Sequence, residues 1–138
     1  MNNANLKIVL AKPGLDGHDK GIRLVAMALR DYGYNVSYLG LRQQPRVIAQ
    51  KVAEQTADVV GLSILSGAHL SVCRHTLAEM KKANLSHVPL IVGGVIPEAD
   101  IQPLKDMGVA EVFPVGSPFA DVDSWLKKYQ EHQGRIVS

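Results

Sequence analysis

Short apolar runs rich in β-branched residues alternate with longer amphipathic segments along the whole chain. Strands are predicted at residues 7–12, 35–39, 59–64, 90–92 and 111–115. Helices are predicted at residues 20–32, 45–56, 70–84, 97–107 and 119–132, and residues 133–138 are expected to be loose. The pattern is therefore that of a protein in which every strand is followed by a helix.

This alternation predicts an α/β fold, because parallel strands need crossover connections of the length that the helical segments supply. We expect a doubly wound five-stranded parallel sheet of flavodoxin-like (Rossmann-like) strand order 2-1-3-4-5. Pro45 and Pro97 suit first helical turns, and Gly33 and Gly108 suit the ends of helices. With 138 residues, 46% of them hydrophobic, a single domain over residues 1–138 is expected.

Composition narrows the classes of function. The net charge of +2 comes from 15 basic and 13 acidic side chains, which are well mixed and accompanied by few aromatic residues, so nucleic acid is not expected as a partner. Cys73 is the single cysteine and the N-terminus lacks a signal-peptide pattern, which predicts a cytoplasmic location. No apolar run approaches the roughly 18 residues of a membrane span.

The unusual residues fall in loops that should meet at the carboxyl edge of the sheet, where open α/β sheets bind ligands. These loops are residues 13–19, 65–69 and 93–97. The first contains His18 beside two aspartates, the second follows a strand that ends with Ser63, and the third begins at Gly93 and Gly94. Glycines there leave space for a ligand to approach the backbone. The expected site is a deep slot with few polar anchors.

Several common occupants of such a slot do not match. A phosphoacceptor receiver domain needs an acidic pair at the end of the first strand, an aspartate at the end of the third and a lysine at the end of the fifth, where this chain has Lys12, Ser63 and Gly116. Gly14, Gly17 and Gly21 are spaced wrongly for a dinucleotide-binding turn, and residues 13–21 hold no hydroxyl side chain for a flavin phosphate. The receiver, dinucleotide and flavodoxin interpretations are therefore not favoured.

A single imidazole with a nearby carboxylate remains. A transition metal held by protein alone usually takes three or four side-chain ligands, so His18 with Asp16 and Asp19 would make a poor divalent site. A metal inside a macrocycle needs only one axial imidazole from the protein. Asp16 could then accept a hydrogen bond from the other ring nitrogen.

At this point the sequence resembles a known family. The similarity rests on three motifs in order, Asp16-x-His18-x-x-Gly21, Ser63-x-Leu65 and Gly93-Gly94. They are similar to motifs of the cobalamin-binding domain of coenzyme-dependent mutases and corrinoid methyltransferases. Residues 12–18 and 93–98 are closest to the methylmalonyl-CoA mutase family, which includes 2-hydroxyisobutyryl-CoA mutase. The resemblance spans nearly the whole chain.

The resemblance implies that His18 replaces the cofactor's own benzimidazole as the axial cobalt ligand. Asp16 would orient the imidazole, and Lys12 would contact that aspartate. Gly17 and Gly21 would let the loop and the following helix approach the corrin. These roles are what membership of the family would imply.

The resemblance also implies a slot for the displaced nucleotide tail. Ser63 and Leu65 would contact the tail, Gly93 and Gly94 would leave room for it, and residues 116–117 would close the far side. The candidate cofactor-binding residues are Lys12, Asp16, Gly17, His18, Asp19, Gly21, Ser63, Leu65, Gly93, Gly94, Gly116 and Ser117. No residue of this chain is expected to catalyse the reaction itself.

The function that the resemblance implies is that of the small subunit of a two-component acyl-CoA mutase. It would hold adenosylcobalamin for a radical 1,2-rearrangement of the carbon skeleton, and would be inactive without a large acyl-CoA-binding TIM-barrel subunit. The acyl-CoA is not identified. A corrinoid methyl carrier is the alternative, although such carriers usually have a helical cap before the first strand. A third interpretation is a cobalamin-responsive sensor or an interaction module.

Overall fold

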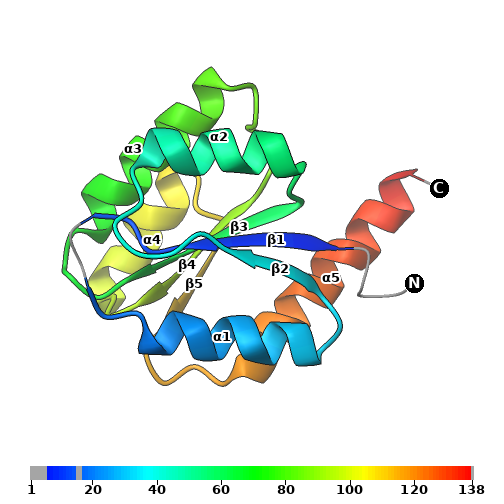
Figure 1. Cartoon of the computed structure of the whole chain (residues 1–138), viewed down its shortest axis with the longest axis horizontal. Helices are drawn as coiled ribbons and strands as arrows, with labels where there is room; N and C mark the ends of the chain where they lie inside the picture. Colours follow the sequence, from blue (N-terminus) through cyan, green and yellow to red (C-terminus); the bar gives the residue numbers. More distant parts are fainter. Residues whose placement is uncertain (1–5, 15–16, 138) are drawn as a thin grey trace.

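A computed structural model describes residues 6–14 and 17–137, in which five strands alternate with five helices (Figure 1). The elements are β1 (Lys7–Ala11), α1 (Lys20–Asp31), β2 (Asn35–Tyr38), α2 (Pro45–Gln55), β3 (Val59–Ile64), α3 (His69–Lys82), β4 (Leu90–Gly94), α4 (Glu98–Met107), β5 (Glu111–Pro114) and α5 (Phe119–Val137). All strand pairs are parallel, and their order is β2-β1-β3-β4-β5. The predicted fold class and strand order are confirmed.

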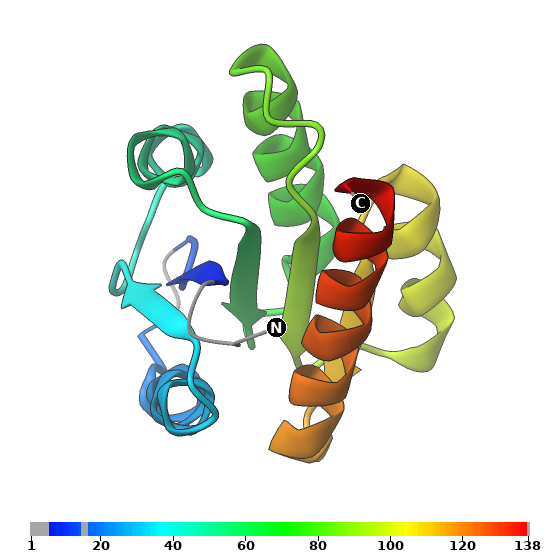
Figure 2. The ribbon, with the colours of Figure 1, turned by 90° about the vertical axis from the view of Figure 1, so that its right-hand side faces the viewer.

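Helices cover both faces of the sheet. Figures 1 and 2 show α2, α3 and α4 on one face and α1 and α5 on the other. Side chains alternate along each strand, so β1, β3, β4 and β5 contribute to two apolar layers, whereas β2 contributes to one. Val9 and Val60 pack in the layer under α2, α3 and α4, whereas Ile8 and Val59 pack in the layer under α1 and α5. We call these the α2–α4 face and the α1/α5 face.

Local sequence explains where the helices begin and end. In α1 the buried residues Ile22, Ala26 and Leu29 recur at helical spacing, which sets one apolar stripe against the sheet. Pro45 is the first residue of α2. Gly33 and Gly108 take positive φ angles of 103° and 124° just after α1 and α4, as expected of residues that end helices.

Most elements differ from the prediction by one or two residues at an end, and α5 differs by more. Helix α3 begins one residue early, at His69, and α5 continues to Val137, so the loose segment predicted after residue 132 is wrong. The backbone stays helical through Gly134, because one glycine lowers helix stability without ending a helix. In the described part of the chain no helix has the length and apolar character needed to cross a membrane.

Candidate functional site

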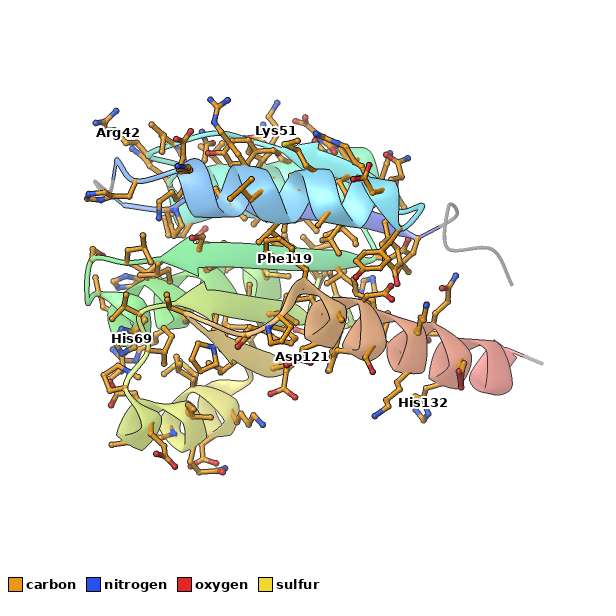
Figure 3. The ribbon with its side chains drawn as sticks, turned by 90° about the horizontal axis from the view of Figure 1, so that it is seen from below. Arg42, Lys51, His69, Phe119, Asp121 and His132 are labelled. Atoms are coloured by element: carbon orange, nitrogen blue, oxygen red, sulfur yellow. The ribbon has the colours of Figure 1, made fainter. Side chains whose placement is uncertain are left out.

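A cavity of about 400 Å³ lies on the α1/α5 face, at the carboxyl end of the sheet. Figure 3 looks onto this face and shows Phe119 where α5 begins. Residues from α1, from β3, β4 and β5, from the segments that follow these strands and from α5 line the cavity. Leu24 and Val25 of α1 and Val122 of α5 are among the apolar side chains of its walls. The cavity is large enough for a substantial organic group.

The cavity exists because the strands present small residues to this face near their carboxyl ends. Gly61 of β3 is paired with Leu10 of β1, and Ser63 of β3 is paired with Gly93 of β4. The residues that alternate with them point to the α2–α4 face and are large, namely Leu62, Ile64 and Val92. The same strand ends therefore fill one face and leave the other open.

Gly94 is a position that only glycine can occupy. Its φ of 138° is unfavourable for residues with a side chain, and an added Cβ would overlap the carbonyl oxygen of Ile64. At Gly93 an added Cβ would lie 3.3 Å from the carbonyl oxygen of Phe113, which is a tight contact. Both glycines line the cavity, and they allow β4 to approach β3 at Gly94 and β5 at Gly93.

Lys12 is the largest polar side chain in the core. It is 0% exposed, and its Nζ donates a hydrogen bond of 3.1 Å to the carbonyl oxygen of Ser63 and lies 3.5 Å from the Ser63 hydroxyl. Burying an ammonium group is costly unless hydrogen bonds compensate it, so this position is specified closely. The expected contact with Asp16 stays a prediction, because Asp16 lies outside the described residues.

The loop between β1 and α1 places His18, the candidate metal-ligating residue, at the edge of the sheet. Gly17 and His18 are exposed, and His18 stands three residues before Gly21, which lines the cavity. Asp19 accepts a hydrogen bond of 2.7 Å from Nε of Arg23, and this bond lowers the pKa of the Asp19 carboxyl. The hydroxyl of Tyr38 also donates to Asp19, at 3.4 Å. The carboxylate of Asp19 is therefore already engaged by α1 and β2.

The structure brings most of the predicted slot residues together. Those that line the cavity are Gly21, Ser63, Leu65, Gly93, Gly94, Gly116 and Ser117. Lys12 reaches the cavity through Ser63, while Gly17, His18 and Asp19 lie on the adjoining loop. Sequence reasoning missed the apolar walls, such as Val25, Phe113 and Phe119. The helical spacing of apolar residues in α1 was a signal for Val25 alone.

A histidine and a cysteine outside the cavity have structural roles. His69 is buried, and its Nε2 lies 2.7 Å from Oδ2 of Asp100, which ties the start of α3 to α4. Cys73 is buried on the α2–α4 face, and burial raises the pKa of its thiol to about 12. A thiol with such a pKa is protonated and unreactive near neutral pH.

The side chains of the described residues limit the kind of metal-containing group that this site could bind. Within residues 6–14 and 17–137 no three His, Cys, Asp or Glu side chains come together as a metal site. A metal held by side chains alone is therefore not supported in this part of the chain. An exposed histidine beside an apolar slot fits a metal whose equatorial ligands come from a macrocycle with a tail that can enter the slot.

Comparison with known proteins agrees with this geometry. The family described as B12 binding domain matches residues 6–122. The 2-hydroxyisobutanoyl-CoA mutase small subunit of Aquincola tertiaricarbonis is 36% identical over 118 residues, 86% of this chain and 87% of that protein. The ethylmalonyl-CoA mutase of Methylorubrum extorquens is 46% identical over 107 residues, which are 78% of this chain but only 16% of that protein.

A solved structure supports the same assignment. A cobalamin-binding protein from Desulfitobacterium hafniense superimposes with a TM-score of 0.77 at 27% identity, covering 90% of this chain and 58% of that one. The family match covers most of the described chain, and the residues that line the cavity, Gly93 and Gly94 among them, lie within its span. The chain therefore belongs to the B12-binding domain family.

Proposed function

We propose that the chain, as a single domain, binds adenosylcobalamin in the base-off form, with His18 as the lower axial ligand of cobalt. The observation that carries this proposal is the cavity on the α1/α5 face, which opens beside the loop that bears His18. Once a histidine has replaced the benzimidazole, the freed nucleotide tail needs a binding place of its own. An apolar slot floored by glycines and next to the histidine meets that need.

Each predicted residue has a role in this proposal. His18 would bind cobalt and Asp16 would accept a hydrogen bond from its second ring nitrogen, which fixes the orientation of the imidazole. Lys12, held by Ser63, would place a positive charge near that aspartate. Gly93 and Gly94 would let the tail lie against the backbone of β4, and Leu65 and residues 116–117 would enclose it.

The reaction that we propose is the rearrangement of an acyl-CoA by a two-component mutase. Adenosylcobalamin held by His18 and the slot residues would supply the radical chemistry that a 1,2-rearrangement of the substrate needs. The chain would position the cofactor and would contribute no acid or base. The small subunit of 2-hydroxyisobutanoyl-CoA mutase, a relative of similar length, supports this organisation.

A partner would provide the substrate cavity. The slot described above would be filled by the tail, so an enclosed place for an acyl-CoA must come from elsewhere. We propose a large TIM-barrel subunit that covers the upper face of the corrin. We propose the cytoplasm as the compartment, since Cys73 is a free thiol of the kind that persists in reducing compartments.

The first test is a titration of the chain with adenosylcobalamin, followed in the visible spectrum. His18→Ala should weaken binding and abolish the histidine-on spectrum, and Asp16→Asn should weaken ligation less, by about 10- to 100-fold. His75→Ala, which changes an exposed histidine of α3, is the matched control and should bind like wild type. Unchanged spectra and affinities in both loop variants would contradict the assignment.

The second test concerns the reaction. The cobalamin-loaded chain mixed with a large mutase subunit should isomerise an acyl-CoA, and neither protein should do so alone. If the loaded chain instead accepts and donates a methyl group and never supports isomerisation, it is a corrinoid methyl carrier. This outcome would overturn the mutase proposal and leave the cobalamin site intact.

A further inference from the structure

The turn between β2 and α2, residues 39–43, is joined to the strand from which the His18 loop departs. The backbone N–H of Lys12 donates to Gly40 at 3.2 Å, and the N–H of Gln43 donates back to Lys12 at 3.0 Å. The N–H of Gly14 then donates to Gln43 at 3.4 Å, and Pro13 and Gln43 form a parallel bridge. These bonds extend the pairing between β1 and β2 as far as Gly14, close to the start of the loop that bears His18.

We propose that Gln43 is a positioning residue that aims His18 at the cofactor. This inference rests on the proposed function, because it assigns to Gln43 the task of holding the loop that carries the axial ligand. The backbone of Gln43 is hydrogen-bonded to Lys12 and to Gly14, the residues on either side of Pro13. The side chain of Gln43 stabilises the turn that places its backbone there.

The side chain of Gln43 closes the turn from inside. Its Nε2 donates to the carbonyl oxygens of Leu39 and Leu41, at 3.2 and 3.0 Å, so both amide hydrogens are used. The turn needs this support, since Arg42, a residue with a side chain, has a φ of 55°. A left-handed conformation of a residue other than glycine persists only where the surrounding structure holds it.

One further contact connects the turn with the ligand loop. A Cβ built on Gly17, the residue before His18, would lie 3.5 Å from Nη2 of Arg42, so the Arg42 side chain runs alongside the loop. Figure 3 shows Arg42 at the edge of the molecule where the strands end. Lys12 is anchored from the other side by Ser63 of β3. Residues 12–14, which precede the His18 loop, are therefore held by β3 and by the turn together.

The chain offers a matched set of variants. Gln43→Met keeps the length of the side chain and removes the two donors, and Gln43→Glu places carboxylate oxygens against the two carbonyl oxygens. Gln44→Met is the control, because Gln44 is the next residue, is exposed and makes no side-chain capping bond at the start of α2. Thermal melts followed by circular dichroism show which variants fold. If Gln43→Glu does not fold, the result for Gln43→Met alone tests the role of Gln43.

The experiment measures how much bound cob(II)alamin carries a histidine nitrogen, by electron paramagnetic resonance on the full chain labelled with ¹⁵N-histidine. We expect the ratio of histidine-on to histidine-off cofactor to fall about tenfold or more in both Gln43 variants, as is typical when a group that orients a metal ligand is lost. The Gln44→Met ratio should equal that of wild type. A merely structural role would lower the melting temperature and leave this ratio unchanged.

The outcomes separate the two proposals. If wild type shows the histidine splitting and the folded Gln43 variants show it at the same ratio, Gln43 does not position His18, and axial ligation stands. If wild type itself shows no histidine splitting, axial ligation by His18 fails, and the role of Gln43 fails with it. A loss confined to the Gln43 variants supports the inference.

Discussion

The two faces of the sheet are built from the same strands and end up with opposite properties. On the α2–α4 face three helices cover a continuous apolar layer, in which Ile48, Ile64 and Leu104 are no more than 1% exposed. On the α1/α5 face two helices cover the sheet, and a cavity of about 400 Å³ remains at the carboxyl end. A few small residues at alternate strand positions leave a cavity on one face, where the other face has a filled core.

This difference separates stability from binding. The α2–α4 face buries large side chains against one another, so a truncation there leaves an unfilled space. The α1/α5 face already contains a space, whose floor is formed by the small residues Gly61, Ser63 and Gly93. Changes on the first face should act on the free energy of unfolding, and changes on the second on cofactor affinity.

The largest expected effect comes from the closed face. Ile48→Ala removes a fully buried side chain of α2 and should lower the free energy of unfolding by about 2–5 kcal/mol. Urea unfolding measures this change. Cobalamin affinity of the folded protein should stay close to wild type, and a parallel loss of affinity would break the separation of the two faces.

The next effect concerns the slot. Val25→Phe adds an aromatic ring to a wall of the cavity and should weaken cobalamin binding about tenfold or more, by 1.4 kcal/mol at the least. The free energy of unfolding should not fall, since the ring enters open space. Met27→Phe is the control on the same helix, where the side chain is 58% exposed. Wild-type affinity in Val25→Phe would show that the tail binds elsewhere.

A smaller effect should appear at alkaline pH. Burial raises the pKa of the Cys73 thiol from its usual value of 9.0 to about 12, so between these values only the unfolded chain releases the proton. Stability from this group is complete below pH 9 and declines as pH rises, by about 1 kcal/mol between pH 9 and 10. Cys73→Ala should show a shallower decline in urea unfolding over this interval. Equal slopes would mean that the thiol is not held in a dry core.

The smallest effect is expected at the first turn of α1. An added Cβ at Gly21 meets nothing within 4 Å, so Gly21→Ala should raise the free energy of unfolding by about 0.5–1 kcal/mol. If the corrin approaches this turn, the same methyl group should lower cobalamin affinity. A variant that is more stable and also binds cobalamin as tightly as wild type would remove Gly21 from the site.

Much of the architecture could be predicted from the sequence because it depends on local patterns. The alternation of strands and helices and the parallel order follow from the apolar runs and the crossover lengths. The extent of α5 could not be predicted, because the residues after His132 lack a strong helical pattern and contain a glycine. The backbone continues as a helix there all the same.

The site also contains residues that the sequence could predict and residues that it could not. Residues with special local chemistry, such as His18 and Gly94, stand out in the sequence. The bond between Lys12 and Ser63 joins residues that are 51 positions apart, and Phe113 and Phe119 become cavity walls only when β5 and α5 are in place. Gln43 gave no signal, because the role proposed for it depends on carbonyl groups that only the folded turn brings together.

The most direct test of the central claim is the identity of the axial ligand. Cob(II)alamin bound to the chain should show nitrogen splitting in its electron paramagnetic resonance spectrum, and ¹⁵N-histidine labelling should change the triplet pattern into a doublet. The change should disappear in His18→Ala. A splitting that is unaffected by the label would mean that the cofactor keeps its own benzimidazole or takes another ligand, and it would contradict the account.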